Sequence, residues 1–203
     1  MKIICVGRNY SEHIKELNNS SNENPVIFLK PETAVITGKL PFFIPDFSNE
    51  IHHEVEIVIR INKTGKNIEE RFANRYYDDV TVGIDFTARD LQTELKSKGL
   101  PWELAKSFDG SAPFGSFIGK SEAFQNGAIS FSLKKNGETV QSGNTTDMLF
   151  SIDFIISFVS RFITLKKGDL IFTGTPKGVA AVKKGDTLEG FIGDKKLIDL
   201  KVR

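Results

Sequence analysis

The clearest pattern of hydrophobic and polar positions lies between residues 50 and 61, where the two kinds alternate. Side chains of a β-strand point to opposite faces in turn, so this period of two predicts a strand. One face would be wholly aliphatic and the other would carry mixed side chains. The aliphatic face holds Val55, Ile57, Ile59 and Ile61, and the opposite face holds His52, Glu54, Glu56, Val58 and Arg60.

Residues 80–86 repeat the pattern, with Val82, Ile84 and Phe86 on one face and Gly83 and Asp85 on the other. Short apolar runs predict further strands at residues 2–6, 26–29, 114–118 and 129–133. Asn136 and Gly137 predict a hairpin turn that leads into residues 139–141. The proline-containing segment 33–47 is typical of edge strands and turns.

Helical patterns are fewer. Residues 145–163 place Leu149, Ile152, Ile156, Val159 and Ile163 on one stripe. Residues 87–99 begin with Thr87 as a candidate N-cap and Asp90 three residues later, and they end at Gly99. Shorter helices are expected within residues 67–77 and from Ser11, followed by a polar loop or lid over 16–24. The chain therefore predicts one α/β domain over residues 1–203, rich in β-structure, with a few short helices.

Composition narrows the possible functions. The chain has 203 residues, 39% hydrophobic and 26% charged, which is ordinary for a globular protein. A net charge of +1 gives no electrostatic reason to expect nucleic acid or an anionic membrane as partner. The single cysteine, Cys5, excludes an intrachain disulfide, and no apolar run is long enough to span a bilayer. We expect a cytoplasmic protein.

Glu54 and Glu56 should leave the same face of their strand, with Cα atoms about 6.5–7 Å apart. Two neighbouring carboxylates repel each other unless a cation or a shared proton compensates them. Asp85 sits on the non-aliphatic face of the second strong strand. If the three converge, their oxygens favour a hard cation such as Mg²⁺, Mn²⁺ or Ca²⁺ over Zn²⁺. The alternative is a solvated outer face of an amphipathic strand.

Six motifs, in order from residue 7 to about 182, resemble the fumarylacetoacetate hydrolase family, and most closely its short members, the acylpyruvases and oxaloacetate decarboxylases. The motifs are Gly7-Arg8-Asn9-Tyr10 with His13 and Glu16, then Lys30-Pro31, residues 52–56, residues 83–92, residues 106–109 and residues 168–179.

The resemblance implies a mixed β-roll that houses Mg²⁺ or Mn²⁺ on Glu54, Glu56 and Asp85, commonly in a homodimer. It also implies a small 2-oxo acid as substrate. His13 and Glu16 would form a general-base pair on a lid over residues 11–25, and Lys106 would be a cation beside the metal. Substrate contacts would come from Arg8, Asn9, Arg89, Gln92 and Thr175.

The leading hypothesis is a metal-dependent hydrolase that cleaves the C–C bond of acylpyruvate-type 2,4-dioxo acids through a metal-stabilised enolate. Oxaloacetate decarboxylation needs the same electron sink without an attacking water. Isomerisation or tautomerisation of 2-hydroxy-diene diacids needs only proton transfer. A binding domain without catalytic activity is the alternative of a different class.

Overall fold

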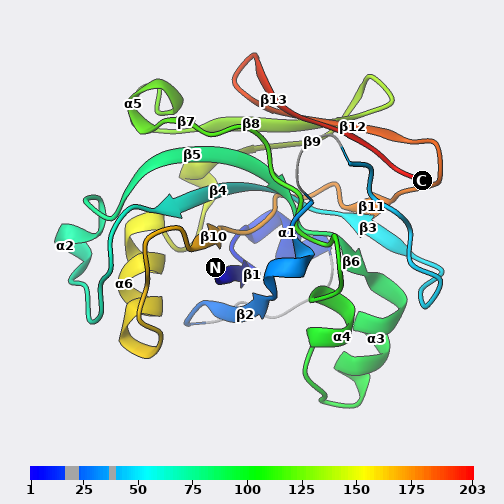
Figure 1. The fold of residues 1–203 in the computed structure, drawn as a ribbon, viewed down its shortest axis with the longest axis horizontal. Coiled ribbons are helices and arrows are strands. Elements are labelled where there is room, and N and C mark those ends of the chain that lie inside the picture. The colour runs from blue at the N-terminus through cyan, green and yellow to red at the C-terminus, as the bar shows by residue number, and fades with distance from the viewer. Residues whose placement is uncertain (17–22, 37–39) are drawn as a thin grey trace.

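The computed structural model describes residues 1–16, 23–36 and 40–203. Three β-sheets dominate this part of the chain, and short helices lie around them (Figure 1). The six-stranded sheet has the order β2-β1-β10-β4-β5-β7 and is mixed, because β1 pairs with β10 in parallel and the other neighbours are antiparallel. Its strands are β1 (Ile3–Gly7), β2 (Val26–Lys30), β10 (Leu170–Phe172), β4 (Val55–Ile61), β5 (Tyr77–Ile84) and β7 (Ile118–Gly119).

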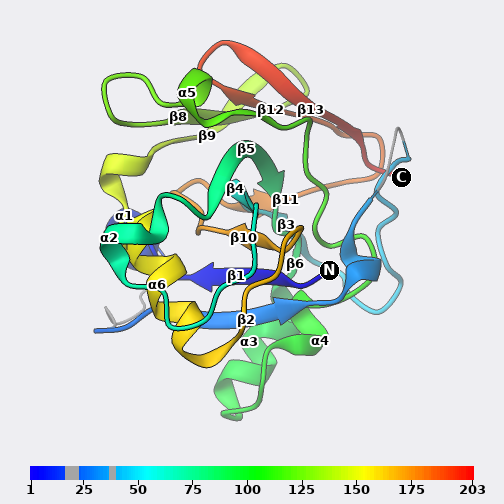
Figure 2. The same ribbon diagram turned by 60° about the vertical axis from the view of Figure 1, so that its left-hand side comes forward.

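The second sheet has the order β13-β12-β8-β9 and forms a separate layer over β4 and β5, seen at the top of Figures 1 and 2. The third, smaller sheet has the order β11-β3-β6. The strands of these two sheets are β8 (Ser130–Lys135), β9 (Glu138–Asn144), β12 (Thr187–Ile192), β13 (Lys195–Lys201), β3 (Ile51–His53), β6 (Thr87–Ala88) and β11 (Ala180–Ala181).

The helices are short. Figure 1 shows α2 and α6 at one end of the six-stranded sheet and α3 with α4 at the other. Their bounds are α1 (Ser11–Glu16), α2 (Glu70–Ala73), α3 (Arg89–Ser97), α4 (Glu103–Lys106), α5 (Lys120–Ala123) and α6 (Ile152–Phe162), with 3₁₀ turns at Glu32–Ala34 and Thr145–Asp147. No helix within the described ranges is long and apolar enough to cross a bilayer. The expected class, a β-rich α/β fold with a few short helices, is confirmed.

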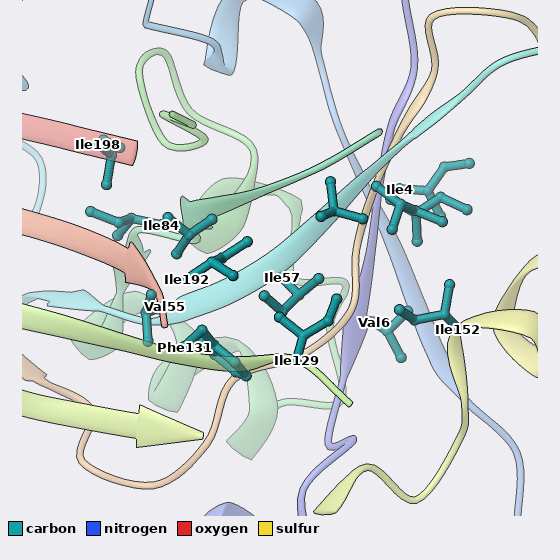
Figure 3. Close-up of a cluster of buried hydrophobic side chains, with 14 of the residues drawn as sticks. Ile4, Val6, Val55, Ile57, Ile84, Ile129, Phe131, Ile152, Ile192 and Ile198 are labelled. Atoms are coloured by element: carbon teal, nitrogen blue, oxygen red, sulfur yellow. The ribbon is translucent and has the colours of Figure 1, made fainter. Parts of the chain in front are cut away.

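The main core lies between the six-stranded and four-stranded sheets. Figure 3 shows Val55 and Ile57 of β4 in one cluster with Ile129, with Phe131 of β8 and with Ile192 of β12. Val55 and Ile57 are fully buried. Each isoleucine or valine buried in this way stabilises the fold by about 1.5–3 kcal/mol relative to an exposed one. This core holds β4 and β5 rigidly, and the functional groups leave the ends of these two strands.

The structure corrects the expected single strand over residues 50–61. The chain leaves the three-stranded sheet after β3, passes through Glu54 and enters the six-stranded sheet as β4. Sequence alternation cannot reveal such a change of sheet, because it continues unbroken through Glu54. The alternative of a solvated outer face is excluded, since Glu54 and Glu56 are 4% and 2% exposed.

Several element boundaries were also wrong. Thr87 lies in β6, so α3 begins at Arg89 without a side-chain cap. The long helix begins only at Ile152, where Ser151 Oγ accepts a hydrogen bond from the Phe154 N–H at 3.1 Å. The helix expected within 67–77 is limited to α2, and the strand expected at 114–118 to β7. In the described part of 33–47 there is a 3₁₀ turn and one bridge, between Phe42 and Val202, in place of edge strands.

Candidate functional site

The three predicted carboxylates meet at one end of β4 and β5. Glu54 precedes β4, Glu56 is its second residue, and Asp85 directly follows β5. Pairing of Val55 with Ile84, together with a 2.8 Å hydrogen bond from the Asp85 N–H to the Glu54 carbonyl, brings them together. Within the described residues, one oxygen of each carboxylate lies within 4.8 Å of the others, and all three side chains are buried.

Two cations hold Glu54. Lys106, at the end of α4, donates to Glu54 Oε2 at 2.8 Å, to Asp85 Oδ2 at 2.8 Å and to Thr87 Oγ1 at 2.6 Å. The Arg89 guanidinium, at the start of α3, donates to Glu54 Oε1. Burial raises the pKa of Glu54, but the charges of Lys106 and Arg89 outweigh it and hold that pKa below its ordinary value. Glu54 is therefore ionised at neutral pH.

Glu56 is held differently. Its Oε2 accepts the Gly174 N–H at 2.7 Å, and it forms no salt bridge with the described residues. Burial, and next the charge of Asp85, raise the pKa of Glu56. A buried carboxylate beside another, without a cation of its own, fits a site for a hard divalent ion. Glu54, Glu56 and Asp85 would hold that ion, and the all-oxygen donor set favours Mg²⁺ or Mn²⁺.

Neither of the adjacent histidines joins this donor set. His52 Nε2 lies 2.8 Å from Glu50 Oε1, and His53 Nδ1 lies 2.9 Å from Gln141 Oε1. His53 is fully buried, whereas His52 is partly exposed. Zinc would prefer nitrogen or sulfur ligands, so the arrangement of these histidines supports the choice of a hard cation.

Lys30 belongs to one of the sequence motifs, but it was not among the predicted site residues. Its ammonium forms a 2.8 Å ion pair with Asp85 Oδ1 and donates to the carbonyls of Lys106 and, at 3.0 Å, Ser111. The side chain is completely buried, although the residue ends an apolar strand before a proline. The sequence signal for its burial was the position of a lysine at the end of an otherwise apolar run. Lys30 fixes Asp85 from the side opposite Lys106.

A pocket opens above the carboxylates, and cationic side chains contribute to its wall. Arg8, Arg89 and Lys96 line it together with Gln92 and Trp102. Burial lowers the pKa of Lys96, and the charges of Arg8 and Arg89 lower it further. Arg89, Gln92 and Lys96 are spaced three and four residues apart, which places them on one face of α3. That spacing could have identified Lys96, which the sequence analysis missed.

Arg8 adopts a backbone conformation that is rare for a residue with a side chain. Its φ is 60°, in the left-handed region, directly after β1. Its guanidinium carbon lies 5.8 Å from the centre of the Trp102 ring. Such strained conformations persist where the surrounding structure enforces them, and they cluster at functional sites. The strain here turns the Arg8 side chain into the pocket wall.

The predicted general-base pair, His13 and Glu16, lies on α1 beside the same pocket. His13 Nδ1 is 3.2 Å from Glu16 Oε2, and the His13 side chain is 7% exposed while that of Glu16 is 33% exposed. Glu16 Oε1 also accepts the Gly178 N–H at 3.0 Å. His13 lines the same pocket as Glu54, Glu56 and Asp85, which places the imidazole near the carboxylates. Residues 17–22 of the expected lid over residues 11–25 lie outside the described ranges.

The structure places the last two predicted residues in different settings. Thr175 is buried and lines the pocket. Asn9 is not among the lining residues, because its amide serves the backbone. Asn9 Nδ2 donates to the carbonyls of Phe150 and Thr173 at 3.0 and 2.8 Å, and its Oδ1 accepts the Phe150 N–H at 2.7 Å. Asn9 therefore holds the end of β1 against the turn that follows β10.

Comparison with known proteins agrees with this geometry. The chain is 47% identical over 190 residues to the mitochondrial oxaloacetate tautomerase of Rattus norvegicus, covering 94% of this chain and 86% of the relative. It is 42% identical to an oxaloacetate tautomerase of Escherichia coli, covering 92% and 86% of the two chains. Among solved structures, fumarylpyruvate hydrolase from Pseudomonas aeruginosa in complex with Mn²⁺ and pyruvate superposes with a TM-score of 0.92 at 36% identity, covering 100% of this chain and 89% of that one.

Residues 2–201 match the model of the fumarylacetoacetate (FAA) hydrolase C-terminal family. This match spans nearly the whole chain. The alignments with the two tautomerases named above likewise cover most of the length of each relative. The chain therefore belongs to the fumarylacetoacetate hydrolase family.

Proposed function

We propose that this protein is an oxaloacetate tautomerase, which interconverts the keto and enol forms of a four-carbon 2-oxo dicarboxylate. The sequence analysis favoured acylpyruvate hydrolysis, whereas the similar proteins named above favour the alternative based on oxaloacetate. The observation that carries the proposal is the buried His13 paired with Glu16 beside the carboxylate cluster. Tautomerisation requires such a proton carrier and no attacking water.

The charges of the pocket suit a dianionic substrate. Glu54, Glu56 and Asp85 are balanced by the buried Lys30 and Lys106 and by the partly buried Arg89, so their formal charges sum to zero. When bound to the three carboxylates, Mg²⁺ or Mn²⁺ supplies a Lewis acid that polarises the 2-oxo group and acidifies the hydrogens at C3. Arg8 and Lys96 also line the pocket, and we assign them the binding of the second carboxylate of the substrate.

His13 and Glu16 provide the proton transfer. With Nδ1–H donated to Glu16, the neutral imidazole keeps a lone pair on Nε2. Nε2 takes one proton from C3, the electron pair of the C–H bond forms the C2–C3 double bond, and the π pair of the C2 carbonyl moves to its oxygen. The imidazolium of His13 then returns the proton to this oxygen, which completes the enol. The Glu16 carboxylate stabilises the imidazolium that forms in between. One proton moves from carbon to oxygen, and no bond between carbon atoms breaks.

The test follows the ultraviolet absorbance of enol oxaloacetate in three samples: Mg²⁺ alone, protein with Mg²⁺, and protein stripped of metal. We expect at least hundredfold faster loss of the enol with protein and Mg²⁺ than with Mg²⁺ alone. Equal rates in all three samples would contradict the proposal. Pyruvate is measured in the same samples, since its release at the same rate would instead identify decarboxylation.

Acylpyruvate hydrolysis is the second candidate. The observation favouring it is the 33% exposure of the Glu16 side chain, which lets solvent reach the pair that would activate a water. Cleavage of acetylpyruvate to acetate and pyruvate, with a higher kcat/KM than tautomerisation, would favour this function. The homodimer and the cytoplasmic location stay predictions from the sequence.

A further inference from the structure

Gln141 lies outside the pocket wall, yet it joins three segments that build the site. It belongs to β9 in the four-stranded sheet, and its side chain is buried, with the residue 2% exposed. Its carboxamide contacts His53 of β3, the backbone between Glu54 and Glu56, and the turn at 175–176 after β10.

The orientation of the amide is fixed at both ends. Its Oε1 accepts the Val55 N–H at 3.0 Å, and a backbone N–H can only donate. Its Nε2 donates to the Pro176 carbonyl at 3.0 Å, and a carbonyl can only accept. A flipped amide would lose both bonds. Because Oε1 is an acceptor, His53 Nδ1, at 2.9 Å, is the protonated ring nitrogen.

This orientation determines how Thr175 can act. Gln141 Nε2 also donates to Thr175 Oγ1 at 3.0 Å, so the hydroxyl oxygen is an acceptor there. The hydroxyl proton has only the Pro176 carbonyl at 3.4 Å as a described partner, which is long for an O–H···O bond. Thr175 lines the pocket, so its proton is available to an oxygen atom of a bound ligand.

The segment 174–178, which contains Thr175, contacts both a metal-binding carboxylate and the general-base pair. Gly174 donates its N–H to Glu56 at 2.7 Å, and Gly178 donates its N–H to Glu16 at 3.0 Å. Gly178 also lies against β9, where an added Cβ would be only 2.5 Å from the Val140 carbonyl oxygen. The segment 174–178 therefore has little room to move relative to β9.

We propose that Gln141 is a positioning residue that acts through Thr175. It holds the 173–176 turn against the strand of the metal-binding carboxylates and keeps the Thr175 hydroxyl oriented as a donor to an oxygen of the bound 2-oxo acid. This inference rests on the proposed function for the identity of the substrate. It does not require tautomerisation to be the reaction.

The experiment is a double-mutant cycle with Gln141→Met and Thr175→Val. Two quantities are measured in the Mg²⁺-loaded protein: kcat/KM for oxaloacetate and the dissociation constant of oxalate by calorimetry. Each single variant should weaken both quantities about tenfold. The double variant should also lose about tenfold, because the second substitution removes an interaction that the first has already disabled.

A general structural role predicts a different result. If Gln141 supports the site independently of Thr175, the two losses multiply to about a hundredfold in the double variant, and this outcome would overturn the inference. Unchanged oxalate affinity in Gln141→Met would overturn it as well. Val159→Ala, a core substitution in α6, is the matched control, since it should lower the melting temperature without changing oxalate affinity.

Gln141→Glu sharpens the test. The carboxylate keeps the acceptor for Val55 but places an acceptor against the Pro176 carbonyl and loses the donor to Thr175. It should therefore match Gln141→Met in oxalate affinity. Wild-type protein that binds oxalate without tautomerase activity would contradict the proposed function and leave this inference testable. Wild-type protein that binds no oxalate would overturn the inference itself.

Discussion

The floor and the wall of the pocket are built in opposite ways. The floor consists of Glu54, Glu56 and Asp85 at the ends of β4 and β5, with Lys30 of β2 and Lys106 of α4, and all five are buried. The part of the wall that lies on the six-residue helix α1 consists of His13, whose partner Glu16 is one-third exposed. We expect the floor to hold the metal ion that each candidate reaction uses, and this part of the wall to determine which reaction takes place.

Substituting the floor should have the largest effect. Glu54→Gln removes a charge that Lys106 and Arg89 both contact, and leaves two buried cations without full compensation. We expect activity to fall at least a thousandfold and Mg²⁺ binding to disappear in calorimetry. Glu50→Gln is the matched control, because Glu50 lies outside the pocket lining and is exposed. Normal metal affinity in Glu54→Gln would refute the assignment of the floor.

Substituting the wall should remove chemistry without removing the metal. His13→Gln deletes the proton carrier, so tautomerisation should fall about a hundredfold, in the range expected for a lost general base. Mg²⁺ affinity should stay within about twofold of wild type. Glu12→Gln on the same helix serves as control, since Glu12 is exposed. If His13→Gln weakened metal binding as strongly as activity, the floor and the wall could not be treated as separate.

Lys96 tests the side of the pocket that faces the second carboxylate. Lys96→Met keeps the length of the side chain and removes its charge. We expect the KM for oxaloacetate to rise about tenfold, while inhibition by 2-oxobutyrate, which has a methyl group in place of that carboxylate, should not change. Lys98→Met is the control, because Lys98 pairs with Glu94 on the exposed side of α3. Equal losses for both ligands would assign Lys96 a structural role.

The smallest predicted effect concerns Asp90, which lies in the first turn of α3 and does not line the pocket. Burial raises the pKa of Asp90, but hydrogen bonds from the Ser48 hydroxyl and the N–H groups of Asn49 and Leu91 outweigh it and lower that pKa. A lowered pKa stabilises the fold above the ordinary pKa of aspartate, and this contribution disappears as the pH falls through the lowered value. Asp90→Asn should therefore lose about 1 kcal/mol in urea unfolding at pH 7, after allowance for solvent screening. The difference from wild type should shrink toward pH 3, and kcat should not change.

The sequence predicted the floor better than its surroundings. Glu54, Glu56 and Asp85 were recognisable because alternation marks the face of a strand and because the family motifs include them. Lys30, although part of a motif, and Lys96 were not predicted as site residues, because a single lysine is usually a surface charge and its burial depends on segments distant in sequence. The change of sheet at Glu54 and the scaffold position of Asn9 depend on tertiary contacts in the same way. Local patterns identify the elements, whereas long-range pairing decides which side chains face the pocket.

The arrangement of α3 has a consequence for protein engineering. Arg89, Gln92 and Lys96 present one face of a nine-residue surface helix to the pocket, apart from the sheets that hold the carboxylates. A library that randomises positions 92 and 96 would explore new substrates while Arg89 continues to hold Glu54. Selection for other chain lengths or charges on the acid should therefore begin at these two positions, which line the pocket beside Arg89.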